Sequence, residues 1–351
     1  MYKMSKTIVV TGISGSGSKE FCNQYSKIKG EEGEKVRVYH TGDMIYQLAK
    51  QAYSSLPKQN LLNLHPSMLA NLRDSVFDTI TDSLNSDRKN YDKIVIDTHA
   101  QFFWNHVYQN AYDWKYLSKI PADMFVTIID KPSGIKEQQL TTEEGRAQKH
   151  DLRDLLLWQN IEANVTEGWA KNYGKPMYIF SRKQNPQVLD SLLENDFLIY
   201  SSFPMTDAAS DANSKIVNFK ARLRGLRTQI DGMETPVIDP ADIDVETGNE
   251  LTEPERKAID AQTVHRDLYW DIRQSTHVVA FYPDEKISLS KGVSDELKEG
   301  METGKFVYVI FPRERRSPFT NNVHGIFRNE DEFFEFFKEQ MKTDLERFRR
   351  K

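Results

Sequence analysis

Thr7-Ile-Val-Val-Thr-Gly-Ile-Ser-Gly-Ser-Gly-Ser-Lys-Glu-Phe21 is the stretch that decides the fold of the first half of the chain. An apolar, β-branched run leads into a turn with three glycines, and a helix-forming segment follows. Glycines let the backbone adopt positive φ angles and bring its N–H groups close to an anion, and the following helix adds the positive end of its dipole. The stretch therefore predicts a strand, a phosphate-binding loop and a helix.

The loop departs from the usual phosphate-loop pattern, Gly-x-x-x-x-Gly-Lys-Ser/Thr, at its last two positions. Gly12 and Gly17 keep their spacing, but Ser18 occupies the lysine position and Lys19 the hydroxyl position. Neighbouring residues of a helix point about 100° apart, so these two side chains are not interchangeable. We therefore expect this loop to bind a nucleotide. The sequence gives less support for fast phosphoryl transfer. The residues predicted to contact the nucleotide cofactor are Gly12, Ser14, Gly15, Ser16, Gly17, Ser18 and Lys19.

Two other interpretations of the loop stay open. A flexible glycine-serine turn between a strand and a helix would need no ligand. A dinucleotide-binding fingerprint fits less well, because Glu20 stands where a third glycine should follow Gly15 and Gly17.

The composition is that of an ordinary globular protein with room for two domains: 351 residues, 38% hydrophobic and 28% charged. A formal net charge of −5 gives no reason to expect a nucleic acid or an anionic membrane as partner. Residues 1–6 are too short and polar for a secretory signal, and no apolar run reaches the length of about 18 residues that a bilayer requires. We therefore expect a cytoplasmic protein. The single cysteine, Cys22, excludes an intramolecular disulfide.

Short apolar runs alternate with helix-length segments from the start of the chain to about residue 195. The expected strands cover residues 7–11, 35–39, 93–97, 124–130 and 176–180. This alternation predicts an α/β fold with a parallel sheet wrapped by helices. Ligands bind such sheets at the carboxyl ends of the strands, where residues 12–19, 40–43 and 97–99 would converge.

Two aspartates near these strand ends are candidates for the nucleotide site. Asp97 ends an apolar strand, the position from which a phosphate-loop protein holds Mg²⁺, so ATP and Mg²⁺ are the expected cofactors. A helix N-cap or a strand-end turn is the alternative for Asp97. For Asp43, an N-cap and a nucleotide contact are equally open. His99 and His106 lack metal-ligand spacing and are expected not to bind a metal.

The first half of the chain resembles archaeal-type adenylate kinases, a family of P-loop nucleoside monophosphate kinases. The resemblance rests on Val10-Thr-Gly with the loop after it, on the Gly42-Asp43 turn and on Asp97-Thr-His. It implies an ATP pocket in a domain of residues 1–195, with Arg146 as a lid arginine that stabilises the transferred phosphoryl group.

The sequence differs from that family in two further places. Leu62 stands where the family has an arginine that holds the acceptor phosphate, and residues 101–108 replace a segment rich in proline and glycine. Phosphoryl transfer depends on charged groups of this kind, whose loss can cost orders of magnitude in rate. The resemblance therefore implies ATP binding, and the differences argue against ordinary adenylate kinase activity.

A second set of strands and helices begins near residue 196. The expected strands cover 197–200, 236–239, 277–282 and 305–311, and the expected helices cover 213–230, 255–274 and 293–303. They predict a second, smaller Rossmann-like α/β domain over residues 196–328, with an acidic loop or lid at 240–255. Residues 329–351 predict a C-terminal amphipathic helix whose phenylalanines pack onto one of the domains.

Three carboxylates of the second half could carry chemistry. Glu296 follows Gly292 in a segment that opens a helix, so we expect it in the first helical turn. Asp267 and Asp271 lie four residues apart and share a helical face. Paired carboxylates near an anomeric carbon cleave glycosidic bonds. The alternative is that an acidic residue stands in a first turn only because the helix dipole favours it.

The order of motifs from residue 197 to residue 316 is similar to that of the nucleoside 2-deoxyribosyltransferase family, which includes nucleotide N-glycosidases. The motifs are Tyr200-Ser-Ser-Phe-Pro, Val237-Ile-Asp-Pro, Arg266-Asp, Ser275-Thr-His-Val-Val-Ala and Gly292-x-x-x-Glu. The resemblance implies that Glu296 is the nucleophile and that Asp267, or Asp271 as the competing choice, positions the sugar. It also places Ser201, Ser202 and Gly292 at the substrate, while Thr276 stands where the family often has an aspartate.

We therefore expect a two-domain enzyme of nucleotide metabolism, with an ATP-binding kinase-like domain and a domain that cleaves or exchanges an N-glycosidic bond. The expected partners are small nucleotides or nucleosides, with no nucleic acid and no membrane. One alternative is a nucleotide kinase with a non-catalytic second domain, and another is a nucleotide-gated sensor or interaction protein. The base, the sugar, the phosphate count and the oligomeric state, a homo-oligomer included, stay open.

Overall fold

The computed structural model describes residues 5–52, 56–204, 210–243, 251–285, 287, 290–312 and 323–349. The chain divides into two compact units. The first unit contains Met1–Pro186 and Val245–Ile259, and the second contains Gln187–Asp244 and Asp260–Lys351.

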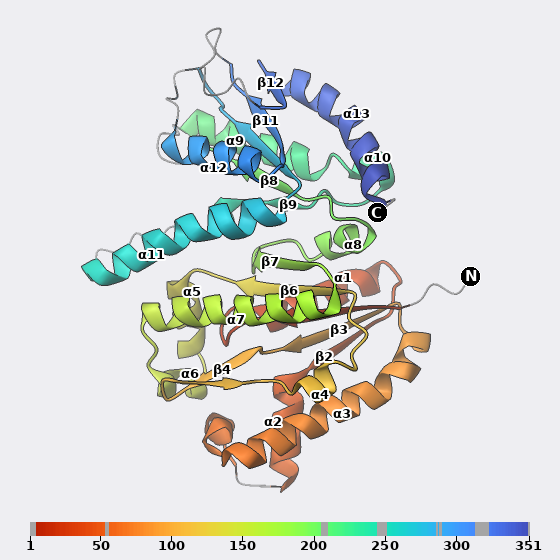
Figure 1. The fold of residues 1–351 in the computed structure, drawn as a ribbon, viewed down its shortest axis with the longest axis vertical. Helices are drawn as coiled ribbons and strands as arrows, with labels where there is room; N and C mark the ends of the chain where they lie inside the picture. Colours follow the sequence, from red (N-terminus) through yellow and green to blue (C-terminus); the bar gives the residue numbers. More distant parts are fainter. Residues whose placement is uncertain are drawn as a thin grey trace. The chain divides into compact units, whose positions relative to one another are not determined.

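The first unit is built on a parallel sheet of five strands (Figure 1). Its strands are β1 (Lys6–Thr11), β2 (Val36–His40), β3 (Lys93–Thr98), β6 (Met124–Ile129) and β7 (Met177–Ser181). Their order across the sheet is β2-β3-β1-β6-β7, so the strand before the glycine-rich loop is central. The predicted α/β fold with a parallel sheet is confirmed, and each predicted strand lies within one residue of its observed bounds.

Helices cover both faces of this sheet. They are α1 (Ser18–Glu31), α2 (Thr41–Ala52), η1 (Lys58–Asn63), α3 (Pro66–Asn90), α4 (Trp114–Leu117), α5 (Pro132–Leu140), α6 (Glu143–Gln148) and α7 (Leu152–Tyr173). Val9, Ile96 and Phe125 share a core cluster with Phe77 of α3 and Trp169 of α7. Alternate strand residues point to the opposite face, which α1 covers through its contacts with β1, β2, β3 and β6.

An antiparallel hairpin follows β3 and was not predicted. Its strands are β4 (Gln101–Trp104) and β5 (Val107–Asn110). The two-residue turn consists of Asn105 and His106, with φ angles of 51° and 59°. Such turns usually contain glycine, which tolerates positive φ, and its absence here removed the usual sequence signal.

The second unit also contains a parallel sheet of five strands. Its strands are β8 (Ile199–Ser202), β9 (Val237–Ile238), β10 (His277–Phe281), β11 (Phe306–Ile310) and β12 (Gly325–Phe327). The order is β12-β11-β10-β8-β9. After β8 the chain adds β9 on one side of it, and then adds β10, β11 and β12 on the other side. This confirms a second α/β fold, although β12 was not predicted.

The described helical segments of this unit vary from a single turn to more than five turns. They are α8 (Val188–Glu194), α9 (Ser210–Arg224), α10 (Thr228–Asp231), η2 (Pro240–Asp242), the π-helical η3 (Arg266–Ile272), α12 (Lys291–Glu302) and α13 (Glu330–Arg349). Helix α11 (Glu253–His265) begins within the residues of the first unit and ends within those of the second. The expected acidic loop at 240–255 lies partly outside the described residues.

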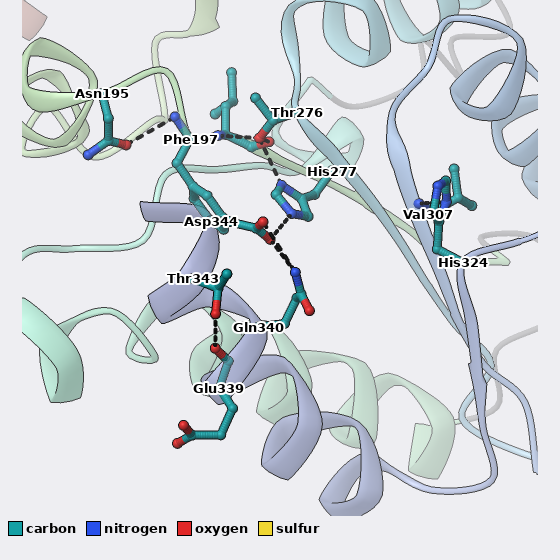
Figure 2. Close-up of polar contacts among 11 residues, drawn as sticks. Asn195, Phe197, Thr276, His277, Val307, His324, Glu339, Gln340, Thr343 and Asp344 are labelled. Atoms are coloured by element: carbon teal, nitrogen blue, oxygen red, sulfur yellow. Dashed lines mark hydrogen bonds and ion pairs between the residues drawn. The ribbon is translucent and has the colours of Figure 1, made fainter. Parts of the chain in front are cut away.

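Helix α13 packs its apolar face against the sheet of the second unit. Phe333, Phe337 and Met341 belong to the same core cluster as the strand residues, whereas Phe336 is 42% exposed. A buried polar contact reinforces this packing, because Nε2 of His277 on β10 lies 3.2 Å from Oδ2 of Asp344 on α13 (Figure 2). In the part of the chain that the structure describes, no helix is both long and apolar enough to cross a membrane.

Candidate functional site

Each unit holds one group of candidate residues at the carboxyl ends of its strands. In the first unit, the loop between β1 and α1 forms a cradle, defined here as residues 12–19. Gly15 and Gly17 have φ angles of 90° and 89°, which other residues rarely adopt. At Gly12 an added Cβ would lie 2.5 Å from Ser16 Oγ and 3.1 Å from the carbonyl oxygen of Ile128. The conformation therefore requires glycine at these three positions.

A buried hydroxyl points to a ligand in the cradle. Ser16 is fully buried, and its Oγ has no hydrogen-bond partner among the described residues. An unpaired buried polar atom is costly, and a bound phosphate oxygen would accept its hydrogen bond. Helix α1 begins at Ser18 directly after the cradle, so the positive end of its dipole faces the same place. These features fit a phosphate group.

Lys19, the residue at the hydroxyl position of the usual pattern, is paired with a carboxylate. Its Nζ contacts Oδ2 of Asp43, and Lys58 Nζ lies 3.7 Å from the other oxygen. Burial alone would raise the pKa of Asp43, but the hydrogen bond and charge of Lys19, together with Lys58, outweigh it and lower that pKa. Asp43 is the third residue of α2, so the structure does not support the N-cap alternative for it.

Asp97 lies within β3, one residue before its end, so the N-cap alternative does not hold for it either. Its Oδ2 is 2.7 Å from Nδ1 of His40 at the end of β2, and its carbonyl oxygen accepts a hydrogen bond of 3.1 Å from Thr41 Oγ1. The predicted convergence of residues 40–43 and 97–99 is thus present. Among the described residues, no group of three or more His, Cys, Asp or Glu side chains could hold a metal ion.

Arg146, the predicted lid arginine, lies on α6 and is exposed. Its Nη1 donates a hydrogen bond of 2.8 Å to the carbonyl oxygen of Leu140. A cation that the sequence analysis missed lies beside the cradle instead. An added Cβ on Gly17 would be 3.2 Å from Cβ of Arg182, whose Nη1 is 3.3 Å from Oδ2 of Asp130. The sequence signal was the position of Arg182, directly after the last strand of the sheet.

A second missed residue, Glu162 of α7, is fully buried beneath the cradle. Its carboxylate accepts hydrogen bonds from the backbone N–H groups of Gly12, Ala100 and Gln101, at 3.2, 2.7 and 2.8 Å. Burial raises the pKa of Glu162 to about 8, and the three N–H groups oppose that rise. A lone acidic residue among the apolar positions of α7 was the available signal.

In the second unit, the carboxylate of Glu296 lies against two hydroxyls of β8. The Tyr200 hydroxyl donates a hydrogen bond of 2.9 Å to Oε1, and the Ser202 hydroxyl donates one to Oε2. Tyr200 and Ser202 are two residues apart on one strand and therefore point to the same face of the sheet. Burial raises the pKa of Glu296 to about 7, although both hydroxyls favour the ionised form. Tyr200 was not predicted as a site residue.

The start of α12 corrects one expectation. The helix begins at Lys291, two residues earlier than predicted, so Glu296 lies in its second turn rather than its first. The dipole explanation for an acid at this position is therefore wrong. Gly292, a predicted substrate contact, is exposed, and an added Cβ there would meet only Ser290 Oγ at 3.7 Å, so packing within the protein does not require glycine at this position.

Gly300 is the glycine of α12 that brings Glu296 to the sheet. An added Cβ would lie 2.9 Å from Cγ2 of Val278 and 3.1 Å from Cγ2 of Val307. Because Glu296 is four residues earlier, it lies on the same face of the helix. The close approach at Gly300 thus lets the carboxylate reach Tyr200.

Asp267 and Asp271 lie on the π-helical segment η3, and the carboxylates of both lie near the guanidinium of Arg266. Arg266 Nε is 2.8 Å from Oδ1 of Asp267 and 3.8 Å from Oδ2 of Asp271. Burial raises the pKa of both aspartates, and the charge of Arg266 opposes that rise. The negative charge of Asp267 also raises the pKa of Glu296, so the two carboxylates interact. Short π-helical turns are frequent at functional sites.

Ser201 takes a different position from its neighbour. Its hydroxyl donates a hydrogen bond of 3.0 Å to the carbonyl oxygen of Ile238 on β9. Side chains alternate along a strand, so Ser201 and Ser202 point to opposite faces. Of the two predicted substrate-binding serines, Ser202 lies at Glu296 and Ser201 holds β9.

Comparison with known proteins finds a similarity in the first unit. Residues 11–155 match the family model of an AAA domain. No curated protein matches the chain. Among solved structures, a protein described as a candidate kinase from Chloroflexus aurantiacus J-10-fl matches with 10% identity and a TM-score of 0.34, over 55% of this chain and 94% of that chain. A similarity at this identity and TM-score supports no conclusion about the function of this chain.

Residues 11–155 of the first unit are therefore similar to an AAA domain, which supports nucleotide binding at the P-loop. The family match ends at residue 155 and says nothing of the second unit.

Proposed function

We propose that the chain is a two-site enzyme of nucleotide metabolism. The cradle of the first unit binds ATP, and Glu296 of the second unit cleaves or exchanges the N-glycosidic bond of a nucleoside or nucleotide. The observation that carries the proposal is the Glu296 carboxylate, which Tyr200 and Ser202 hold from both oxygens at the carboxyl end of β8. In sheets of this type, ligands bind where the strand order reverses, as it does between β8 and β10.

In the proposed reaction, ionised Glu296 attacks C1′ of the sugar. A bond forms between Oε of Glu296 and C1′, and the bond from C1′ to the base nitrogen breaks. The base leaves with the electron pair of that bond and takes a proton from solvent. Water or a second base then attacks C1′ and releases Glu296. Asp267, oriented by Arg266, accepts hydrogen bonds from the sugar hydroxyls.

At the first site, the N–H groups of the cradle and the start of α1 would hold the phosphates of ATP. Asp97, with phosphate oxygens and water, would hold Mg²⁺, which usually takes only one or two protein carboxylates. Bound Mg²⁺ would neutralise part of the phosphate charge. An adenylate-kinase-like acceptor site has less support, because Leu62 packs against the core cluster instead of presenting a charge.

The alternative enzyme is a nucleotide kinase whose second unit is not catalytic. The positive φ angles of Gly15 and Gly17 and the unpaired hydroxyl of Ser16 favour this kinase, because both features are typical of a phosphate-binding site. The third candidate is a nucleotide-gated sensor. The pairing of Lys19 with Asp43 favours it, because a lysine bound to a carboxylate is less able to stabilise a transferred phosphoryl group.

The experiment is chromatography of nucleosides, nucleotides and NAD after incubation with the protein and Mg²⁺. Wild type is compared with Glu296→Gln and with Glu302→Gln, an exposed glutamate of the same helix that pairs with Lys298. Free base from wild type and Glu302→Gln, but not from Glu296→Gln, supports the proposal. Conversion of ADP to ATP and AMP without free base selects the kinase. No turnover with tight ATP binding selects the sensor.

A further inference from the structure

We propose that Glu162 is a positioning residue that ties the cradle to the chain after Asp97, so that the phosphate-binding and Mg²⁺-binding parts of the site move as one body. The inference rests on the proposed binding of ATP at the cradle and adds a residue that acts through the backbone rather than by touching the ligand.

The three hydrogen bonds of Glu162 join two segments that are far apart in the sequence. Oε1 accepts from the N–H of Gly12, the first residue of the cradle, and from the N–H of Ala100. Oε2 accepts from the N–H of Gln101. Ala100 is three residues after Asp97, so these bonds fix the chain where it leaves β3. One buried side chain thus holds both the start of the cradle and the exit of β3.

Neighbouring side chains of α7 hold the same region from the same face of the helix. Trp158 Nε1 donates to the carbonyl oxygen of Gln101 at 2.9 Å, and Gln159 Oε1 accepts from the N–H of Asp130 at 3.0 Å. Thr166 Oγ1 lies 2.9 Å from Thr11 Oγ1 at the end of β1. Helix α7 therefore presents a row of polar groups to the carboxyl ends of three strands, with Glu162 in its middle.

The chemistry of the site requires a carboxylate rather than an amide. All three partners of Glu162 are N–H donors, which match the ionised carboxylate, the form that only accepts hydrogen bonds and that prevails above its raised pKa of about 8. A glutamine would turn its NH₂ group toward one of those donors. Hydrogen bonds to an ionised group are roughly twice as strong as neutral ones, which offsets part of the cost of the buried charge.

The test compares ATP affinity with and without Mg²⁺ by isothermal titration calorimetry at about pH 9, above the raised pKa of Glu162. The variants are Glu162→Gln and, as a matched control, Glu167→Gln, an exposed glutamate of the same helix that pairs with Lys171. In wild type and control, Mg²⁺ should strengthen ATP binding. In Glu162→Gln, we expect metal-free ATP affinity within about threefold of wild type and a loss of about tenfold or more in the Mg²⁺ effect, the size typical of residues that orient a metal ligand.

The outcomes separate this inference from the proposed function. An equal loss with and without Mg²⁺ in a folded Glu162→Gln protein, or no loss, would overturn the coupling while leaving ATP binding intact. Absence of ATP binding in wild type would instead overturn the proposed function of the cradle.

Hydrogen exchange of the wild-type protein keeps the inference testable if Glu162→Gln does not fold. Addition of Mg²⁺ and ATP should slow exchange in residues 11–19 and 99–104 together. Protection confined to residues 11–19 would contradict the coupling.

Discussion

The hydroxyl of Tyr200 lies 2.9 Å from Oε1 of Glu296 and donates a hydrogen bond to it. The two residues come from β8 and α12, 96 positions apart in the sequence. Tyr200 is fully buried, so its hydroxyl favours the ionised carboxylate in a place where burial opposes ionisation. Together with the hydrogen bond from Ser202, this contact favours the ionised form of the proposed nucleophile.

Replacing Tyr200 with phenylalanine should slow base release about tenfold or more, since a hydrogen bond to a charged group contributes about 1.5–3 kcal/mol. Loss of the donor raises the pKa of Glu296 further above about 7, so the acid side of the pH–rate profile should move to higher pH. The check is the rate of base release from pH 5 to pH 9. Tyr269→Phe, at an exposed tyrosine, is the control and should leave the profile unchanged.

Replacing Gly15 with alanine should weaken ATP binding about tenfold or more. The φ angle of 90° strains any other residue, and the added Cβ would lie 2.8 Å from the carbonyl oxygen of Ile135. Gly33→Ala is a matched control, because Gly33 has a φ angle of 86° and an added Cβ there meets nothing within 4 Å. The control should lose about 1 kcal/mol of stability and no ATP affinity. Equal affinities of the two variants would argue against a ligand in the cradle.

The unfolding free energy should contain a component that decreases as the pH rises from about 4.5 toward about 8. The pKa values of Glu162 and Glu296 are raised to about 8 and about 7 in the folded protein, so the folded state binds more protons than the unfolded state. Their stabilising contribution is complete below about pH 4.5 and is lost as each group ionises. Urea unfolding of wild type and Glu162→Gln across this range is the check, and the variant should show a flatter dependence. An unchanged slope would contradict the raised pKa.

Replacing Asp344 with alanine should lower the unfolding free energy of the second unit by about 1–3 kcal/mol, because it leaves Nε2 of the buried His277 ring without its partner, while Nδ1 keeps the hydroxyl of Thr276. Burial lowers the pKa of His277 and Asp344 opposes that shift, so stability from this group is present above about pH 6.5 and is lost as the pH falls further. Asp344→Ala should therefore be less stable at low pH than wild type. Urea unfolding checks this, with Glu335→Ala at an exposed position of α13 as the control.

Much of the fold was predictable because its signals are local. The apolar runs that became β1, β3 and β6 are buried on both faces, and such runs are recognisable without knowing their neighbours. The hairpin β4–β5 and the short strand β12 were missed. The first lacks a glycine in its turn, and the second has only three residues.

The candidate sites were predictable only in part. The glycines of the cradle and the carboxylate of Glu296 carry their own signals, in spacing and in motif. Tyr200 and Glu162 do not, because a tyrosine on a strand and a glutamate on a helix are ordinary until their partners are known. The packing role of Gly300, which lets α12 approach the sheet, was not predicted.

The sequence by itself determined the parallel strands, the phosphate cradle after β1 and the carboxylates available for chemistry, because apolar periodicity and the φ freedom of glycine act within a few residues. Only the tertiary structure decided which groups meet. Glu162 reaches Gly12 and Ala100 because α7 packs on the first sheet, and Glu296 reaches Tyr200 because Gly300 lets α12 approach the second. Such contacts depend on how closely a helix packs on a sheet, and a local sequence pattern does not predict that distance.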